Sequence, residues 1–471
     1  MAITDYNFNA GSYVKSGSAR VITCTSTSIS SNFKYRFYLE LIYDSQTYSY
    51  TFRPNEDDYG IINIGKILQS IVEPISVQQV LTVPDADTTL TSNNFQQNIH
   101  SMPHFKFVGT GHREQYLSTA GSSVKRIQAK LYDFFAVNET DVPTKQGTPV
   151  TDYYYVIGGY GTSTDLINET YVDYKLLSAN SLLLSPLYCK DVDSSIKEIK
   201  VGLGDYGSVS FFNTTDDVNQ VTRPHNFLIT YYNSAGVQLQ TQELLQSVDY
   251  GGNFSTAGVT DDSMIITFGC FPANLNKLPN TYYRPVDFST LAYYDLIVRN
   301  DADVQRTKKY RFRIVNRCKK YDTQRFAYIN SFGVWEYITF HKKRTDELSS
   351  KRTEIKSSVF DYTRTYTQNS GDYKEASYVP GVAHESRVIK ASDVKSKFTV
   401  NTGYLEDYEI SKVKEMFLSP KINYINTDGT AIAVMLTNSS IDEVVVSHRY
   451  EQTEYKLNFE YSVPKYNPII F

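Results

Sequence analysis

The chain has 471 residues, 41% of them hydrophobic and 21% charged, which is enough to bury several cores and suggests two to four domains. Its net charge of −4 lacks the basic excess of a general nucleic-acid binder, and no apolar run approaches the roughly 18 residues of a membrane span. The 40 tyrosines and 25 phenylalanines favour half-buried sheets with aromatic cores, with assembly interfaces as the alternative.

The N-terminus and the cysteines predict a protein that is made and used without export. The opening MAITDYNFNAGSYVK lacks the basic and apolar regions of a secretory signal. Cys24, Cys189, Cys270 and Cys318 are far apart and match neither a CxxC zinc pattern nor a dense disulfide framework. We therefore expect four free thiols, mostly buried.

Residues 1–180 are predicted to form a β-sandwich with one inserted helix. The run YRFYLELIY at 35–43 alternates as a strand, and a turn at 44–46 leads to TYSYTF, which predicts a hairpin. The segment NIGKILQSIVEP has helical spacing, with Asn63 as the expected N-cap and Pro74 as the stop. Residues 81–123 are polar and predict a long loop or arm.

Residues 181–318 predict a second β-sandwich, because six or more short strand patterns follow one another with turns and without helices. The sequence NSAG at 233–236 separates two alternating runs and is typical of a hairpin turn. In YRFRIV at 310–315, Tyr310 and Phe312 would lie on one face and Arg311 on the other.

Residues 319–471 predict a β-rich domain with one short helix. A half-buried hairpin is expected around Trp335, followed by a charged segment that indicates a solvated strand pair or a loop. The segment LEDYEISKVKEMFLSP has helical spacing and stops at Pro420. Strands are expected at 443–450 and 455–461. The fold class is therefore mainly β, with two immunoglobulin- or fibronectin-like sandwiches and this C-terminal domain.

Two patterns raise the question of a cofactor or metal site. GLGDYG at 202–207 matches G-x-G-x-x-G, but its continuation SVSFF alternates as a strand, whereas a dinucleotide site needs a helix there. A glycine-rich hairpin is the preferred interpretation. His100, His104 and His112 form the only histidine cluster, but Pro103 disfavours the helix that would place two rings on one face. We expect loop histidines that bind nothing.

Candidate catalytic groups are equally sparse. The acidic pairs Asp57/Asp58, Asp261/Asp262 and Asp301/Asp303 lie beside turn residues, where aspartate is common. No G-x-S-x-G elbow or Cys–His signature is present. We therefore predict no catalytic, cofactor-binding or metal-binding residue.

Residues 308–325 contain eight Lys or Arg in eighteen positions. Lys309, Arg311 and Arg313 would share one strand face, which could contact phosphates or acidic neighbours. An ion-paired assembly contact is the preferred interpretation of this face.

The C-terminal third resembles virion proteins of tailed phages that infect Bacteroidetes, including the crAss-like phages. The resemblance lies in RIVNRC, AYINSFGVWEYITF, EMFLSPKINYI, TAIAVMLT and a terminal FEY strand, with Cys318, Asn330 and Gly333 as its anchor. YGIINIGKILQSIV and YYYVIGG add a weaker match in the N-terminal half. Tyr328 stands where the family often has a tryptophan. The resemblance implies a tail, ring or baseplate component and carries no active-site residues.

These observations predict a non-enzymatic structural subunit of a phage tail, made in the host cytoplasm and assembled as a homo-oligomeric ring or sleeve. Its partners would be copies of itself and neighbouring tail or portal-proximal proteins, with no membrane span and no specific nucleic-acid binding. The alternative is a receptor- or glycan-binding β-sandwich protein at the tail tip. A glycoside hydrolase is a third class, resting only on β-content and available carboxylates.

Overall fold

The computed structural model is mainly β, which confirms that part of the predicted fold class, while the immunoglobulin- or fibronectin-like sandwiches stay a prediction. Within the part of the chain that it describes, there are 26 strands and three helices. The described residues are 3–8, 13–18, 20–43, 45–72, 117–119, 124–161, 174, 176–212, 226–245, 265–276, 289–300, 302–315, 320–356, 360–363, 377–380, 387–440 and 454–462.

The N-terminal unit consists of two sheets, of order β1-β3-β6 and β2-β9-β8-β4-β5, which share one hydrophobic cluster. Their strands are β1 (Ile3–Asn7), β2 (Tyr13–Lys15), β3 (Val21–Ser26), β4 (Phe33–Tyr43), β5 (Gln46–Phe52), β6 (Gly60–Asn63), β8 (Val124–Ala136) and β9 (Thr144–Ile157). The predicted hairpin is confirmed, because Tyr43 pairs with Gln46 across the β4–β5 turn. Its inward face is the predicted one, with Phe37 and Leu39 fully buried.

The predicted first helix is present as α1 (Gly65–Ile71), but its expected N-cap is wrong by one residue. Ile64 occupies the N-cap position and makes no side-chain cap bond. The Asn63 side-chain oxygen instead accepts hydrogen bonds from the backbone N–H groups of Gly65 and Arg20, both at 3.0 Å. Asn63 therefore connects the start of α1 to Arg20, which immediately precedes β3. Pro74 lies outside the described residues.

The middle unit contains a six-stranded sheet, β10-β11-β17-β16-β13-β14, and a three-stranded sheet, β12-β15-β7. Its strands are β7 (Leu117–Thr119), β10 (Lys190–Asp191), β11 (Ile196–Val201), β12 (Val209–Phe212), β13 (Asn226–Asn233), β14 (Gln238–Leu245), β15 (Ile265–Phe268), β16 (Leu291–Arg299) and β17 (Lys309–Ile314). Aromatic rings join the two sheets: the Phe227 centroid lies 5.5 Å from that of Phe211 and 4.5 Å from that of Phe268. The predicted 233–236 turn is confirmed between β13 and β14.

Two predictions for this region are wrong in detail. The segment 181–318 contains a helix, α2 (Pro272–Leu275), which is too short to produce a periodic pattern in the sequence. Its buried Asn274 accepts a hydrogen bond at 2.8 Å from the N–H of Gly207, so tertiary contacts rather than propensity hold it. The expected loop at 81–123 includes strand β7, which pairs with β15 of the middle unit. The rest of that segment, residues 81–116 and 120–123, lies outside the described residues.

The C-terminal unit is a seven-stranded sheet of order β19-β18-β24-β25-β26-β23-β20 with one helix beside it. Its elements are β18 (Gln324–Ile329), β19 (Trp335–Phe340), β20 (Arg344–Lys356), β23 (Arg387–Asn401), α3 (Asp407–Leu418), β24 (Ile422–Ile425), β25 (Ala431–Leu436) and β26 (Lys456–Tyr461). The predicted helix near Pro420 and the 455–461 strand are confirmed. The strand expected at 443–450 lies outside the described residues.

The hairpin β18–β19 is buried on both faces, so the prediction of a half-buried hairpin is wrong. Ala327 and Trp335 belong to the cluster shared with the middle unit, whereas Phe326 and Phe340 belong to a second cluster under α3. The β18–β19 hairpin therefore separates two hydrophobic cores and packs against one on each face. Sequence alternation alone did not reveal this, because Glu336 and Arg325 resemble solvent-facing residues but find buried partners instead.

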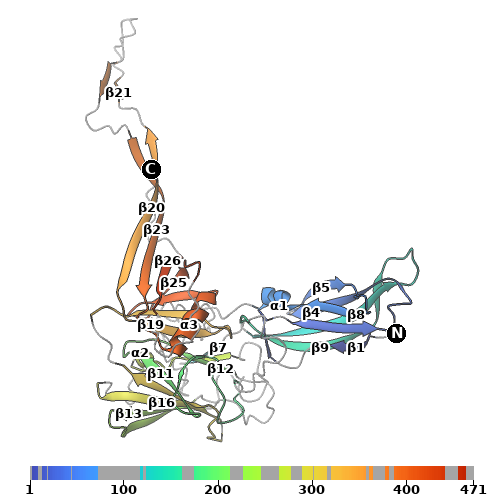
Figure 1. Ribbon diagram of the computed structural model, residues 1–471, viewed down its shortest axis with the longest axis horizontal. Coiled ribbons are helices and arrows are strands. Elements are labelled where there is room, and N and C mark those ends of the chain that lie inside the picture. The colour runs from blue at the N-terminus through green and yellow to red at the C-terminus, as the bar shows by residue number, and fades with distance from the viewer. Residues whose placement is uncertain are drawn as a thin grey trace, which may run out of the picture.

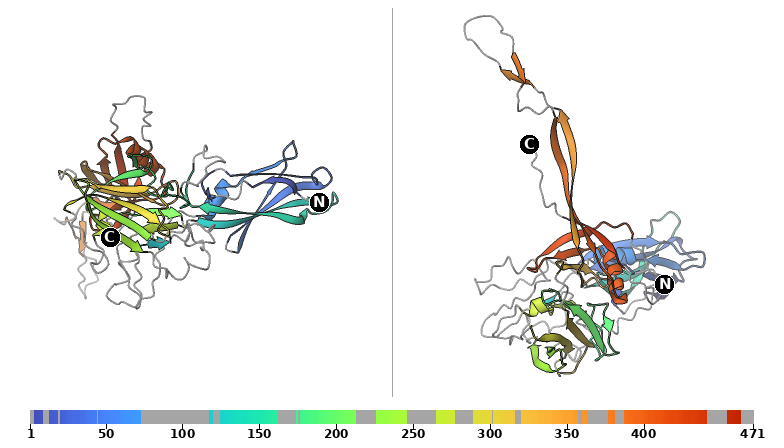
Figure 2. Two further views of the ribbon diagram at one scale, coloured as in Figure 1. Left: turned by 90° about the horizontal axis from the view of Figure 1, so that it is seen from below. Right: turned by 60° about the vertical axis from the view of Figure 1, so that its left-hand side comes forward.

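Strands β20 and β23 form a long two-stranded ribbon that projects away from the rest of the molecule (Figures 1 and 2). The charged segment after residue 340, expected as a solvated strand pair or a loop, forms the single strand β20, and its partner β23 comes from later in the chain. A short pair, β21 (Phe360–Thr363) and β22 (Ser377–Pro380), lies beyond its far end (Figure 1).

The division at residues 180 and 318 stays a prediction. Each of the three largest sheets is built from a single predicted domain. One hydrophobic cluster nevertheless crosses both boundaries, because it contains Val124 and Ile157 as well as Phe312 and Trp335. The three units are therefore continuous with one another through their cores.

A glycine contact fixes the N-terminal unit against the β18–β19 turn. The N–H of Tyr160 donates to the carbonyl of Ser331 at 3.1 Å, and a Cβ on Gly159 would lie 2.1 Å from that same oxygen. Gly333 has φ +75°, and a Cβ there would lie 2.0 Å from the carbonyl oxygen of Gly158. The backbones approach so closely that neither position accommodates a side chain.

We expect Gly159→Ala to lower the free energy of unfolding by about 1–3 kcal/mol, because the added methyl group must push two backbones apart. Gly204→Ala is the matched control, since nothing lies within 4 Å of its added Cβ, and it should change stability little. Urea denaturation followed by the emission of Trp335, the only tryptophan, measures both. Equal midpoints for the two variants would contradict a tight glycine contact.

Candidate functional site

The glycine motif at 202–207 is a turn between two sheets, and the predicted hairpin is wrong. The Asp205 carboxylate accepts a hydrogen bond at 2.8 Å from the N–H of Gly202, and the Asp205 N–H donates at 3.0 Å to the Gly202 carbonyl. Strand β11 before it pairs with β17, whereas β12 after it pairs with β15 in the other sheet. The continuation is a strand, as predicted, and gives no helix terminus for a pyrophosphate.

The acidic turn residues that the structure describes occupy turns, as predicted. Asp58 and Asp303 have φ +63° and φ +59°, and the N–H of Asp303 donates to the carbonyl of Asn300. Asp261, Asp262 and Asp301 lie outside the described residues, as do His100, His104 and His112. Among the described residues, no group of three or more His, Cys, Asp or Glu side chains is placed to hold a metal ion.

The basic strand face on β17 is paired with carboxylates of the same chain. The Arg311 guanidinium makes two hydrogen bonds to Asp295 of β16, at 2.8 and 3.0 Å, and Lys309 lies 3.7 Å from the same carboxylate. Arg313 pairs with Glu198 of β11 at 2.8 Å. The acidic neighbours of this face include carboxylates of the same chain, and these pairs connect strands of the six-stranded sheet. The interpretation of the face as an assembly contact stays a prediction.

Three of the four cysteines behave as predicted. Cys24, Cys189 and Cys270 are buried and free. Burial raises the pKa of Cys24 and of Cys189 to about 12, so these thiols stay protonated and weakly nucleophilic at neutral pH. Cys318 lies outside the described residues.

The most unusual chemistry lies where sequence analysis assigned none, in the buried ion pair of Glu336 and Lys412. Glu336 of β19 is fully buried, and one of its carboxylate oxygens lies 3.1 Å from the ammonium of Lys412 on α3. The other oxygen accepts hydrogen bonds from the N–H of Leu187 at 2.7 Å and from the Asn330 side chain at 3.3 Å. Removing either charge alone would leave the other buried, which typically costs about 3–5 kcal/mol.

Asn330, an anchor of the family resemblance, organises the turn next to this pair. Its amide nitrogen also donates to the carbonyl of Leu184 at 2.9 Å. Its side-chain oxygen accepts from the N–H of Phe332 at 3.0 Å, inside the turn that Gly333 completes. The asparagine therefore links the β18–β19 turn, the middle unit and Glu336.

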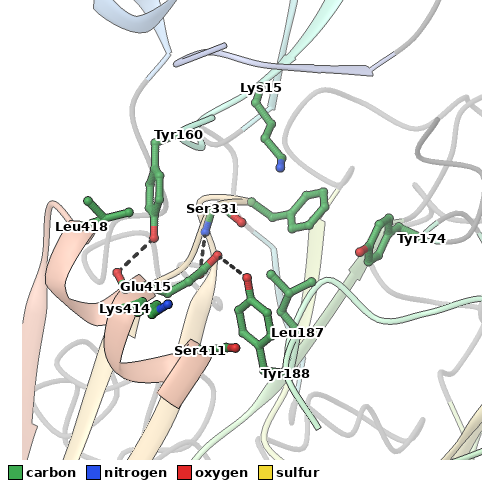
Figure 3. Close-up of a pocket in the computed structure, with 11 residues that line it drawn as sticks. Lys15, Tyr160, Tyr174, Leu187, Tyr188, Ser331, Ser411, Lys414, Glu415 and Leu418 are labelled. Carbon is green, nitrogen blue, oxygen red and sulfur yellow. Dashed lines mark hydrogen bonds between the residues drawn. The ribbon is translucent and has the colours of Figure 1, made fainter. Parts of the chain in front are cut away.

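A second carboxylate, Glu415, lies one helical turn further along α3 and lines a cavity of about 430 Å³ (Figure 3). It accepts hydrogen bonds from the N–H of Ser331 at 3.1 Å and from the Tyr188 hydroxyl at 3.3 Å. The Tyr160 hydroxyl donates at 3.0 Å to the backbone carbonyl of Glu415 (Figure 3). Residues of all three units therefore meet at one helix.

The environment of Glu415 favours its neutral form. Burial raises the pKa of the carboxyl, and the nearby charge of Glu336 raises it further, while the Ser331 and Tyr188 hydrogen bonds partly oppose this. Among the described residues, the fully buried Tyr328 hydroxyl has no hydrogen-bond partner. Burial raises its pKa, and the charges of Glu336 and Glu415 raise it further. The result is a crowded group of acidic side chains beside the buried Lys412.

The remaining cavity wall carries groups suited to a polar ligand with apolar faces. Lys15 and Lys414 contribute ammonium groups, and Tyr174 and Phe332 contribute neighbouring rings with centroids 4.6 Å apart. The Lys15 ammonium lies 4.4 Å from the Phe332 ring centroid. The volume lies within the range of small-molecule sites. The oxygens of Glu415 are, however, already engaged in holding Ser331 and Tyr188.

Glu336, Lys412 and Glu415 were missed by sequence analysis. The available signal was the charge itself. Glu336 is the only charged residue of β19, and Lys412 and Glu415 lie three residues apart beside the apolar Val413 and Met416. A charged residue among apolar neighbours in a strand or helix indicates a buried ion pair. The residue that pairs with it can be identified only from the fold.

No protein-family model matches the chain, and no curated protein is significantly similar to it in sequence. Among the described residues, no helix is long and apolar enough to cross a membrane.

We expect Glu415→Gln to flatten the pH dependence of stability. Because the folded-state pKa is raised, the folded protein keeps a proton that the unfolded chain releases above about pH 4.5. That stabilisation is complete at lower pH and is lost as the pH rises through the raised pKa, at up to about 1.4 kcal/mol per pH unit. Urea midpoints measured from pH 4.5 to 8 test this, with the surface variant Glu139→Gln as control. A slope identical to that of the unmodified chain would contradict it.

Proposed function

We propose that the chain is a non-enzymatic structural subunit of a phage virion, which assembles as a homo-oligomeric ring or sleeve in the tail. Its partners would be copies of itself and neighbouring tail or portal-proximal proteins. The proposal rests on the family resemblance of the Asn330–Gly333 turn and on the physical character of the molecule. It would be made in the host cytoplasm and act in the virion.

The projecting ribbon is the observation that carries this proposal. Strands β20 and β23 pair over thirteen residues of β20, and the part of β20 nearest the body is largely exposed, including Leu348 at 61%. A two-stranded ribbon is only marginally stable by itself in water. A two-stranded ribbon that projects from the core would be stabilised by contact with another molecule, because the contact buries its surface and pairs its edge strands.

The joint of the three units supports the same proposal. Buried ion pairs, glycine contacts and a shared hydrophobic cluster hold the units together around α3 and the β18–β19 turn. A subunit under mechanical load needs such a joint, because weakly packed domains would move relative to one another.

We expect a variant with a shortened ribbon to fold but to assemble poorly. Ser350 and Val394 are paired across the ribbon, so residues 351–393 can be replaced by Asn-Gly, which closes a two-residue hairpin. The buried cluster that contains Phe326, Phe398 and Phe459 is built from residues outside the deleted segment and should remain intact. Light scattering coupled to size exclusion would then report smaller species than for the full chain.

The proposal is wrong if the full chain stays monomeric at high concentration and mass spectrometry finds none of it in purified phage particles. Unchanged assembly of the shortened variant would refute the role of the ribbon alone. Unchanged emission of Trp335 in that variant verifies that its core is folded.

A receptor- or glycan-binding role at the tail tip is the second candidate, and the cavity beside Glu415 favours it. Tyr174 and Phe332 offer ring surfaces for a sugar, and Lys414 and Ser411 offer hydrogen-bond donors.

If the cavity binds a glycan, a glycan array should show hits that Tyr174→Ala weakens about tenfold or more, because the stacking surface is lost. The mutation Tyr153→Ala, at an exposed ring on β9, is the matched control and should leave binding unchanged. An array without hits for the intact chain would rule this candidate out.

A further inference from the structure

Strand β20 is an edge strand with an unusual order of charges. It ends the seven-stranded sheet, and among the described strands it pairs only with β23. Its outer edge therefore presents backbone N–H and C=O groups that a further strand could pair with. The described side chains from Thr345 to Leu348 are exposed.

Charged residues on an edge strand commonly prevent pairing with other chains, which is the simplest interpretation of β20. The sequence RTDELSSKRTEIK is more specific than that protection requires. Its acidic pair, Asp346 and Glu347, precedes Ser349 by three and two positions. Its basic pair, Lys351 and Arg352, follows Ser349 by two and three positions. The charges are thus mirrored with opposite sign around one residue.

We propose that β20 pairs antiparallel with β20 of a second copy of this chain, with Ser349 opposite the partner's Ser349. In this register Asp346 is opposite the partner's Arg352, and Glu347 is opposite the partner's Lys351. Arg344 is opposite the partner's Glu354. Each pairing occurs twice because the contact is two-fold symmetric. Opposite charges directly across an antiparallel pair stabilise it, and like charges destabilise it.

The neighbouring symmetric registers are disfavoured by the same sequence. Centring the contact on Leu348 places Arg344 opposite the partner's Arg352. Centring it on Ser350 places Asp346 opposite the partner's Glu354 and Arg344 opposite the partner's Lys356. Only the Ser349 register, among these three, aligns opposite charges without a like-charge pair. The strand therefore specifies both its partner and its register.

This inference rests on the self-assembly in the proposed function and names one contact within it. A two-fold contact joins subunits in pairs, whereas closing a ring needs a different, head-to-tail surface. The β20 contact would therefore connect two subunits of facing rings, or hold a dimer before ring closure. Self-association through β20 can fail while ring formation persists.

A charge swap on the full chain tests the contact. Asp346→Arg and Arg352→Asp should each raise the dimer dissociation constant about tenfold or more, because each places like charges opposite each other twice. The double variant should restore dimerisation, because the pairs are then reversed rather than broken. Sedimentation velocity over a range of micromolar concentrations measures this, and added salt should weaken the dimer of the unmodified chain.

Two controls separate the contact from local effects. Asp346 also pairs with Arg344 of its own strand at 2.6 Å, so Asp346→Asn removes that pair without adding a like charge and should weaken dimerisation less than Asp346→Arg. Glu139→Lys changes an exposed charge in the N-terminal unit, away from β20, and should leave the dimer unchanged.

The outcomes distinguish this contact from the proposed function. Rescue by the double variant supports the β20 pairing. Assemblies that neither single variant alters would overturn the pairing and leave the structural role standing. A lack of rescue in a double variant with intact Trp335 emission would also overturn the pairing. An unmodified chain that stays monomeric would overturn both.

Discussion

The buried ion pair of Glu336 and Lys412 is the constraint on which the rest of the structure depends. It lies at the β18–β19 hairpin, which separates two hydrophobic cores. An unpaired buried charge at this position would strongly destabilise the fold. Satisfying Glu336 requires the N–H of Leu187 from the middle unit, the Asn330 side chain from the turn and Lys412 from α3. Hydrophobic burial brings these elements together without fixing their relative positions. The carboxylate fixes them, because its hydrogen-bond partners must approach from set directions.

The same helix and turn also position the N-terminal unit. Lys412 and Glu415 lie three residues apart on α3 and therefore on one side of the helix. When Lys412 pairs with Glu336, the same side of α3 places Glu415 next to Ser331 and Tyr188. The Tyr160 hydroxyl then bonds the Glu415 carbonyl, while Gly159 lies against the Ser331 carbonyl. One helix thereby connects all three units. The raised pKa of Glu415 is a consequence of this crowding and needs no catalytic explanation.

Local periodicity explains which parts of the fold were predictable. The period-two alternation in 35–43 and the turn chemistry at 233–236 predict strands and hairpins, because the residues that form these elements are close together in the sequence. The Glu336–Lys412 pair joins positions 76 residues apart, and Arg325 bonds the Tyr206 carbonyl 119 residues away. Both charges resemble surface residues until those partners are known. The cavity could not be predicted for the same reason, since its lining comes from all three units.

The chain uses its charges in two physically different ways. In the body, basic residues that look available in the sequence are paired internally: Arg311 with Asp295, Arg313 with Glu198, and Arg325 with Asp205. These pairs connect different elements of one chain. Along β20 the charges of Asp346 and Glu347 are exposed, and among the described strands none pairs with the outer edge of β20. In the proposed β20 contact, these exposed charges and the open backbone edge would act together, whereas the paired charges of the body act within the chain.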